Sequence, residues 1–477
     1  MPGPAGLVLA VGIWSAPINA APGALAPPPP PDYVRQGLTQ ALGATLAPCH
    51  HTDHVADPLT LNDAIERSLC HDPALRQAWG NLQLRSAQVD QRRAPYLPRI
   101  DAQGNQSWGR SAVDPVNSNE TMRTRSVSRS GALNLGWVLY DSGRRGAALD
   151  TATHLLAAAN ADQNAAMQRA FLEVAQLYFA AQAANRRMLA AEQVVKLAGE
   201  NFVAASERHQ AGAAALADRL QAQTAYTQAS LKRSRERGAL ASAQGALALR
   251  MGLTASSALR IEIDETPLPT QTYLARVDEL MAIARHHHPE LVAAQARVAA
   301  AEAAVAEAKA TGRPTLTLTG NFTQARNRIA GASAPGSDNR DSTIGLQLSI
   351  PIFRGFEHSY QVKEAQAQAA ISTAELSAHR QRISTDVWTQ HANLKMETEN
   401  LAHTRQLIDQ SMRSLQIMQG RYQAGVGTMT DVLNAMSAYA SAREQHIEGT
   451  RSWQASRLGL AGSLGRLGFW DLNVTGD

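Results

Sequence analysis

Two histidine-rich clusters carry the residue types that bind metals. CHHTDH, at residues 49–54, places three histidines and a cysteine within six residues, and HHH occupies residues 286–288. Histidine and cysteine are the usual zinc ligands. The first cluster is either a metal site or a polar segment before the first helix. The second stands in a capping turn before Pro289, where consecutive side chains point in different directions. We favour the polar segment and the turn, and predict no metal site.

Catalysis and nucleic-acid binding are not indicated elsewhere. The sequence has no nucleophile–histidine–acid set, no glycine-rich phosphate loop and no ordered pair of carboxylates. Its 45 basic and 41 acidic residues leave a net charge of only +4, and the basic residues form no run. Binding to nucleic acid usually requires a basic patch. We therefore predict that the protein is not an enzyme, uses no cofactor and binds no nucleic acid.

Two aspartates occur in a phrase that the chain contains twice. RHQAGAAALADRLQA (208–222) and RYQAGVGTMTDVLNA (421–435) agree at seven positions, 213 residues apart. Gly212 and Gly425 allow the backbone to turn. Asp218 and Asp431 follow six residues later, and Thr428 with Asp431 fits a capping box, whereas Asp218 has no such partner. Arg208 and Arg421 are candidates to pair with the aspartates.

The repeated phrase belongs to an internal duplication. DPAL at 72–75 corresponds to HPEL at 288–291, and WVLYDSG at 137–143 corresponds to IPIFRGF at 350–356. Landmarks in one order indicate two versions of a structural unit. The predicted organisation is a signal peptide (1–21), a proline-rich linker (22–58), a first repeat (59–253), an inter-repeat linker (254–274), a second repeat (275–466) and a C-terminal tail (467–477). The alternative for residues 1–21 is a disordered N-terminal tail. Cys49 and Cys70 are candidates for a disulfide if the protein is exported.

Each repeat predicts helices around a pair of strands. A capping signal at Thr60 and Asp63 starts a short helix, and Asp72-Pro73 and His288-Pro289 start helices of about 22 residues. Apolar residues then alternate with polar ones at 133–139, 316–322 and 344–352, which predicts strands. We expect two strands of about ten residues in each repeat, with polar loops at 110–130 and 324–342.

Long helices complete each repeat. Residues 147–198 and 357–419 contain no glycine or proline, and 63 helical residues span about 95 Å. Each long helix ends at a repeated phrase, and a helix of about 35 residues leads back. We expect the two shorter helices of a repeat to stack end to end along its long helix.

The strands match the length and alternation of strands that cross a bilayer. In lipid every backbone group must be paired, so the sheet must close. Four strands enclose no useful lumen, whereas three chains supply twelve. The alternative is a sheet packed on its apolar face in a soluble sandwich.

The duplicated units, the WVLYDSG and IPIFRGF strand ends and the paired Q-A-G-x5-D turns resemble the TolC family of outer-membrane export channels, over residues 59–466. The resemblance implies a mostly α fold with a membrane β-barrel: a homotrimer with a 12-stranded outer-membrane barrel, continued by a long α-helical periplasmic tunnel of coiled coils. It also implies a periplasmic adaptor and an inner-membrane ABC transporter as partners, with outer-membrane lipid around the barrel.

The resemblance further implies a role for the two turns as the periplasmic tip, where acidic residues ring the aperture. By position, Asp218 and Asp431 are the matching acids. Asn434 stands where an acid can form a second ring, and Gly427 where a clamping arginine can stand. Tyr422 matches a tip tyrosine. Arg208, Gly212, Arg421 and Gly425 are then neighbours of this gate.

The cargo is left between two alternatives. In detail the sequence resembles family members of type I secretion systems, which implies an unfolded RTX-type toxin such as adenylate cyclase–haemolysin. A conduit of this design also serves tripartite multidrug efflux pumps. A soluble coiled-coil adaptor or scaffold explains the helical hairpins, but not the four amphipathic strands.

Overall fold

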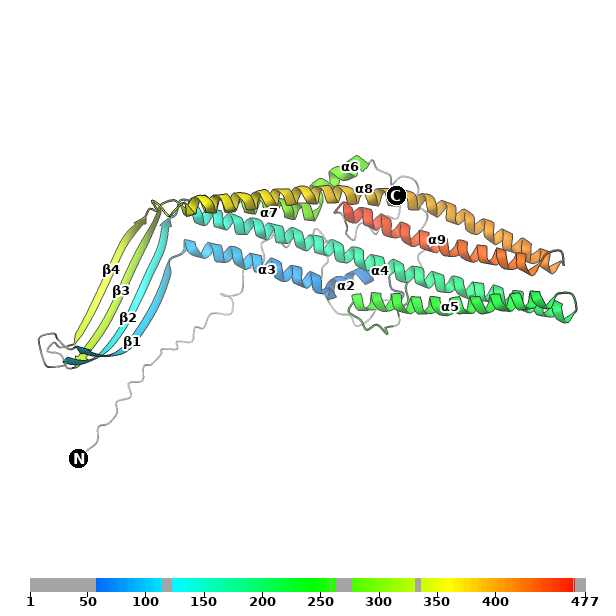
Figure 1. Ribbon diagram of the computed structural model, residues 1–477, viewed down its shortest axis with the longest axis horizontal. Helices are drawn as coiled ribbons and strands as arrows, with labels where there is room; N and C mark the ends of the chain where they lie inside the picture. The colour runs from blue at the N-terminus through cyan, green and yellow to red at the C-terminus, as the bar shows by residue number, and fades with distance from the viewer. Residues whose placement is uncertain are drawn as a thin grey trace, which may run out of the picture.

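The chain forms an elongated molecule, with a four-stranded sheet at one end and long helices along the rest (Figure 1). The computed structural model describes residues 57–113, 122–257, 259–262, 277–330, 336–465 and 467. The elements occur in the same order twice, which confirms the duplication. The first repeat contains α2 (Leu61–His71), α3 (Pro73–Arg93), the 3-10 helix η1 (Ala94–Tyr96), β1 (Arg99–Val113), β2 (Met122–Tyr140), α4 (Arg144–Gln210) and α5 (Leu216–Arg250). The second contains α6 (Val277–His287), α7 (Pro289–Thr311), β3 (Thr315–Ala330), β4 (Ser337–Ser349), α8 (Glu357–Gln423) and α9 (Met429–Ser463).

The short helices begin at the residues that the sequence indicated. Thr60 and Asp63 form a capping box at the start of α2. Asp72 caps α3 by accepting a hydrogen bond from the Ala74 N–H at 2.8 Å. His288 holds the corresponding place before α7, where its Nδ1 accepts from the Glu290 N–H at 3.3 Å. The interpretation of the 286–288 cluster as a capping turn is therefore confirmed.

The strands are longer than predicted. They contain 15, 19, 16 and 13 residues instead of about ten, and they continue through most of the segments 110–130 and 324–342 that we expected to be loops. That prediction was wrong because it followed the alternation of apolar residues, which stops partway along each strand. Backbone pairing needs no apolar side chain, and it continues to Arg125↔Ala330 at the far end of the sheet.

The register of the antiparallel sheet, β1-β2-β3-β4, gives it one apolar face. We define this apolar face as the even-numbered residues of β1, β3 and β4 with the odd-numbered residues of β2. Aligned rows on it include Ile100, Leu135, Gly320 and Ile344, and also Trp137, Leu318 and Leu346. The opposite, polar face carries residues such as Asn134 and Asn321, whose side chains are hydrogen-bonded at 2.7 Å.

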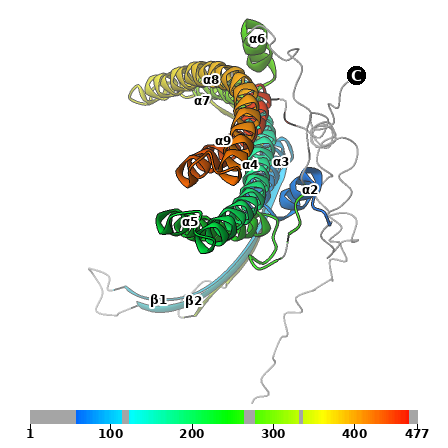
Figure 2. The same ribbon diagram turned by 90° about the vertical axis from the view of Figure 1, so that its right-hand side faces the viewer.

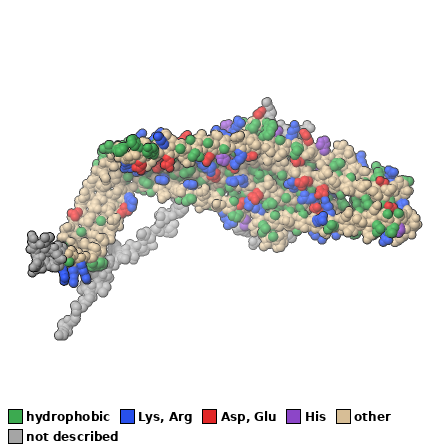
Figure 3. Space-filling view, viewed as in Figure 1, with side chains coloured by type: hydrophobic (Ala, Val, Ile, Leu, Met, Phe, Trp, Pro, Cys, Tyr) green, Lys and Arg blue, Asp and Glu red, His purple; other side chains and the backbone are tan. Residues whose placement is uncertain are grey.

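The apolar face is open in the single chain. Ile344, Leu346 and Leu348 are 75%, 66% and 62% exposed, respectively. The apolar positions continue past the end of β4 at Ile350 and Ile352, and hydrophobic side chains gather where the sheet joins the helices (Figure 3). Contiguous exposed apolar surface of this kind marks an interaction with another protein or with a membrane.

The long helices α4 and α8 each contain 67 residues, about 100 Å of helix. As expected, α3 and α5 lie along α4, and α7 and α9 lie along α8 (Figure 1). The returning helices α5 and α9 have 35 residues each. Most of the residues that α4 buries are alanines, whose small side chains let neighbouring helices approach closely. No helix in the described part of the chain is long and apolar enough to cross a membrane.

A compact core lies midway along α4, and we call it the waist. Leu59 pairs with Ile261 in a parallel bridge, and Tyr178 of α4 donates a hydrogen bond to the Leu59 carbonyl at 3.1 Å. The larger side chains buried with them are Ile65, Phe171, Val174, Leu247, Met251, Leu259, Leu458 and Leu467. Part of the segment 254–274 is thus packed against the first repeat.

An ionic cluster fixes the junction between the sheet and α4. The Arg145 guanidinium pairs with the buried Asp141 carboxylate at 3.0 Å and donates to the carbonyls of Val138 and Pro95, at 2.7 and 3.1 Å. It also lies over the Tyr96 ring, 4.7 Å from the centroid. The aspartate of WVLYDSG therefore has a structural role. At the same offset of 213 residues, the second repeat has Arg354 and His358 instead.

Several predictions about the N-terminus concern residues that the structure does not describe. The signal peptide, the 22–58 linker except its last two residues, the CHHTDH cluster and Cys49 lie outside the described part of the chain. Cys70, near the end of α2, is disulfide-bonded.

His288 makes the stability of the α6–α7 junction depend on pH. Burial lowers the pKa of His288; Arg382 and His379 lower it further, while Glu290 and Asp386 oppose them. Since the folded pKa lies below the unfolded value of about 6.5, the contribution of neutral His288 to stability is complete above that value. It is lost as the pH falls through the folded pKa.

We therefore expect the free energy of unfolding to fall between pH 7 and pH 5, and to fall less in His288→Asn, which retains an acceptor for the cap. Denaturant unfolding followed by helical circular dichroism at several pH values measures this. His403→Asn, at an exposed position of α8, is the control. An identical pH dependence in wild type and His288→Asn would contradict the prediction.

Candidate functional site at the helical tips

The two repeated phrases form turns at the end of the molecule farthest from the sheet (Figure 1). Gly212 and Gly425 follow α4 and α8 with φ values of 71° and 78°. The Ala213 N–H donates to the Arg208 carbonyl at 2.8 Å, and the Val426 N–H donates to the Arg421 carbonyl at 3.0 Å. Both turns are Schellman motifs, in which glycine supplies the left-handed residue.

Asp431 caps α9. Its carboxylate accepts hydrogen bonds from the Thr428 backbone N–H and hydroxyl, at 3.2 and 2.7 Å, and the Asp431 N–H donates back to the Thr428 hydroxyl. These hydrogen bonds lower the pKa of Asp431, which is fully exposed, and the charge of Arg421 lowers it further. The capping-box interpretation is confirmed. The carboxylate stays ionised and open to solvent.

Asp218 lies in the first turn of α5 but makes no cap. Ala215 occupies the N-cap position and offers no side-chain hydrogen bond. The negative charge of Asp218 acts instead on Tyr422 of the second repeat: burial raises the pKa of Tyr422, and Asp218 raises it further. The two matching acids of the sequence therefore have different surroundings.

Arg208 joins the two tips. Its guanidinium donates to the carbonyls of Tyr422 and Gln423 and lies over the Tyr422 ring, 5.0 Å from the centroid. Tyr422 is only 5% exposed, and its hydroxyl is buried without a hydrogen-bond partner among the described residues. Sequence reasoning named both residues, but it did not find this contact.

The arginines do not pair with the aspartates as we considered. Within the described residues, neither Arg208 nor Arg421 forms an ion pair with Asp218 or Asp431, and Arg421 donates weakly to the Val426 carbonyl at 3.5 Å. Gly427 has a packing role, because a Cβ there would lie 3.1 Å from the Arg421 Cβ and from the Tyr422 nitrogen. An arginine at this position would not fit without a shift of the backbone.

Asn434 lies three residues beyond Asp431 on α9 and is exposed. Residues three apart are neighbours on a helix surface. Asp431 and Asn434 thus present an ionised and a neutral polar side chain on one face of the tip.

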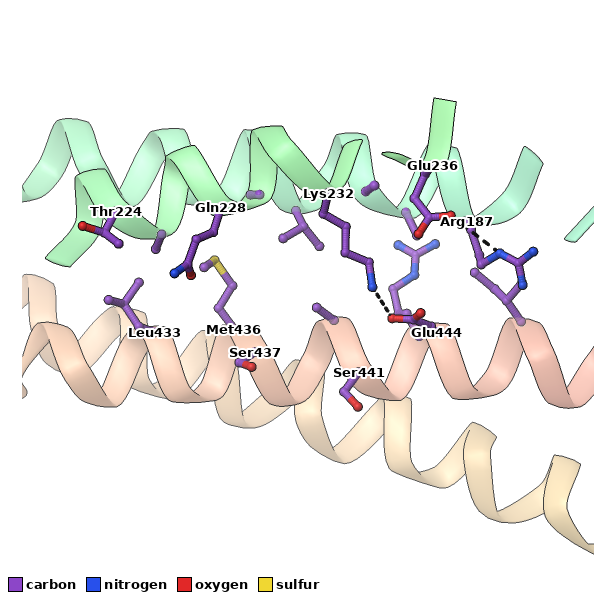
Figure 4. A pocket seen from close by; sticks show the side chains of 18 of the residues that line it. Arg187, Thr224, Gln228, Lys232, Glu236, Leu433, Met436, Ser437, Ser441 and Glu444 are labelled. Carbon is purple, nitrogen blue, oxygen red and sulfur yellow. Dashed lines mark hydrogen bonds and ion pairs between the residues drawn. The ribbon is translucent and has the colours of Figure 1, made fainter. Parts of the chain in front are cut away.

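A groove that sequence reasoning missed lies between α5 and α9 (Figure 4). Its volume is about 670 Å³. Leu220, Leu433 and Met436 line one part, and the Lys232–Glu444 ion pair, at 2.5 Å, crosses another. At the same end Arg187 of α4 lies 3.7 Å from Glu236 of α5. The groove presents an apolar floor with charged groups beside it.

The helices form a curved wall. Viewed from the tips, they follow an arc, and α5 and α9 project from one side of it (Figure 2). A sheet with one apolar face, attached to a curved wall of long helices, is the architecture of a channel subunit.

The chain belongs to the outer membrane efflux protein family, whose model matches residues 64–253 and 280–466. These two matches coincide with the two repeats. Members of this family are outer-membrane channels of the TolC type, with a helical tunnel in the periplasm, and this protein has the same location.

Relatives cover nearly the whole chain. It is 32% identical to protein CyaE of Bordetella pertussis over 435 residues. This aligned region covers 90% of this chain and 89% of CyaE. It is 25% identical to outer membrane protein OprJ of Pseudomonas aeruginosa, over 86% of this chain and 84% of OprJ. It is 22% identical to TolC of Escherichia coli, over 86% of this chain and 83% of TolC.

Solved structures share the fold. The outer membrane protein VceC of Vibrio cholerae superposes with a TM-score of 0.70 at 20% identity, covering 85% of this chain and 96% of VceC. A membrane protein from Pseudomonas aeruginosa superposes with a TM-score of 0.71 at 23% identity, covering 85% of this chain and 93% of that protein's chain.

Loss of the Arg208 contact is expected to loosen the tip. Arg208→Ala removes the hydrogen bonds to the end of α8 and uncovers the Tyr422 ring. A hydrogen bond from a charged group contributes about 1.5–3 kcal/mol, so we expect amide hydrogen exchange around residues 418–428 to become about tenfold faster or more. Mass spectrometry of peptides from the tip measures this.

Arg421→Ala is the matched control, because the weak hydrogen bond to the Val426 carbonyl is the only one that the Arg421 guanidinium donates among the described residues. Equal protection of the tip in wild type and Arg208→Ala would show that Arg208 does not hold the two repeats together.

Proposed function

We propose that this protein is the outer-membrane channel of a type I secretion system, passing an unfolded RTX-type toxin from an inner-membrane ABC transporter to the exterior. The similarity to CyaE over 90% of the chain carries this proposal, since the sequence resembles the cyclolysin (adenylate cyclase–haemolysin) secretion protein of that name. The alternative cargo is small molecules, because relatives at 24% identity are named as outer membrane proteins of efflux pumps.

The two open edges of the sheet support a trimer. Within one chain, β1 and β4 each pair along one side only. Lipid offers no hydrogen bonds to the unpaired N–H and C=O groups of an edge. Pairing β4 of one chain with β1 of the next satisfies both edges, and three chains close a barrel of twelve strands. The apolar face then meets lipid and the polar face lines the lumen.

The same symmetry makes the curved helical walls into a tunnel. Three copies of the tip would surround its periplasmic end, with Asp218, Asp431 and Asn434 near the aperture. Ionised carboxylates around a narrow opening concentrate negative potential and favour cations. Arg208, Gly212, Arg421, Tyr422 and Gly425 would shape the turns that carry these groups.

The groove between α5 and α9 supports a role for a periplasmic adaptor. An amphipathic helix binds by placing its apolar side in such a groove. Leu433 and Met436 offer the apolar contacts, and Lys232 and Glu444 lie beside them. The adaptor would connect the channel to the inner-membrane transporter.

The acidic ring is tested by conductance in planar bilayers. We expect wild-type protein to form discrete cation-selective channels, and the double mutant Asp218→Asn/Asp431→Asn to be less selective and less readily blocked by polyvalent cations. Asparagine at 431 retains an acceptor for the cap, so the fold is preserved.

The double mutant Asp150→Asn/Asp409→Asn removes the same number of charges at exposed positions away from the tip. If the selectivity changes equally in both double mutants, the aspartates of the turns act only as part of the fold. If a folded oligomer forms no channels, the protein is a scaffold or adaptor.

The cargo is tested in a Gram-negative host that lacks its own channels of this family. We expect an RTX toxin to appear in the medium when this protein is expressed with an ABC transporter and an adaptor, and to remain in the cell when it is omitted. Resistance to small antimicrobial compounds should stay unchanged. Resistance that rises without toxin export would favour the efflux alternative.

A further inference from the structure

The apolar face of the sheet changes character partway along the strands. Ile344, Leu346 and Leu348 of β4 present only apolar side chains on this face, a length of about 14 Å of strand, and Ile350 and Ile352 follow just past its end. Beyond that band, toward the end far from the helices, the same face becomes basic. Seven exposed arginines lie on it, and we call them the arginine belt: Arg110, Arg123, Arg125, Arg129, Arg326, Arg328 and Arg340. Basic side chains gather at this end of the sheet in Figure 3.

The polar face carries no such charge at the same level. Opposite the belt, the described residues of the polar face include no lysine or arginine. Ser107, Ser128, Asn327 and Ser337 form one aligned row there, and Asp341, next to Arg340 along β4, is acidic. Solubility outside the membrane would favour charge on either face. The belt is therefore specific to the face that carries the apolar band.

Few of these charges are neutralised within the described residues. Arg326 forms an ion pair with Asp338 at 2.8 Å, and the other six arginines form none with the described residues. Among the described residues of this face, the seven arginines and one aspartate of the belt region leave a formal charge of +6.

Two pairs of arginines are direct cross-strand neighbours. The register places Arg110 opposite Arg125, and Arg129 opposite Arg326. The Cα atoms of opposite residues lie about 4.5–5.5 Å apart, where like charges destabilise a sheet. An anion between the guanidinium groups relieves this repulsion.

We propose that the arginine belt binds the phosphate groups of the phosphorylated glycolipid in the outer leaflet of the outer membrane. This proposal rests on the proposed function, which places the apolar face in lipid and the far end of the sheet outside. Lipid phosphates lie at the edge of the hydrocarbon layer, where the belt begins. Guanidinium groups bind phosphate oxygens in bidentate pairs. Cargo in the lumen does not meet this face.

Trp108 adds an aromatic contact to the belt. It lies on the same face between the rows of Arg110 and Arg129, and it is 72% exposed. Tryptophan is enriched where membrane proteins meet the polar boundary of the bilayer. The belt thus combines cations with a side chain suited to an amphipathic headgroup region.

The test is binding of purified diphosphorylated lipid A to the full-length protein in detergent, by native mass spectrometry and thermophoresis. The variant is Arg125→Gln/Arg129→Gln/Arg328→Gln. Each basic residue near a charged lipid surface strengthens binding several-fold, so we expect an affinity lower by on the order of 100-fold. The control is Arg235→Gln/Arg237→Gln/Arg413→Gln, three exposed helical arginines, and its affinity should equal that of wild type.

Lipid A without phosphates should bind weakly to all three proteins, and millimolar inorganic phosphate should not displace the diphosphorylated form. Equal binding by wild type and the belt variant, or full displacement by inorganic phosphate, would overturn the proposal. Single-channel recordings of the same samples keep the two proposals apart. If channels form but lipid A binds equally well to wild type and to the belt variant, only the proposed lipid site is contradicted. If no channels form, the proposed function fails.

Discussion

The pairing of backbone hydrogen bonds at the edges of the sheet is the constraint on which this structure depends. A four-stranded sheet with an exposed apolar face is unstable alone, because both the face and the edges need partners. Lipid covers the face but leaves the edges unpaired, so only further strands can complete the sheet. The closed barrel and the tunnel of the proposed trimer depend on this requirement.

The sequence predicted the elements where a periodic pattern or a breaker residue marked them. The long helices, the two turns and the caps at Thr60, Asp72 and Thr428 were found because glycine, proline and capping residues act locally. The full length of the strands was missed, since the apolar alternation stops beyond Ile344 and Leu133. A second alternation was present in RTRSVSR (123–129), where arginine or valine alternates with serine and threonine. The arginines of this second alternation lie on the same face of the sheet as the apolar residues.

The candidate site was predictable in part. Asp218, Asp431, Arg208 and Tyr422 were named from the repeated phrase, but their contacts were not. The Arg208–Tyr422 contact joins residues 214 positions apart, and the path of two helical hairpins decides it. The unequal roles of the two aspartates have a local origin: Thr428 supplies a cap, while Ala215 does not. The groove between α5 and α9 needed the packing of both repeats and had no local signal.

Because α4 is uninterrupted, a small rotation at its middle would produce a larger displacement at its end. The waist at Tyr178 contacts this helix near its middle, and the shorter helices α3 and α5 contact different parts of it. About 48 Å of helix extends from the waist to Gln210. If α4 pivots at the waist, a rotation of about 5° there moves the tip by roughly 4 Å. In the proposed trimer, a movement of this size at the tip would change the width of the opening.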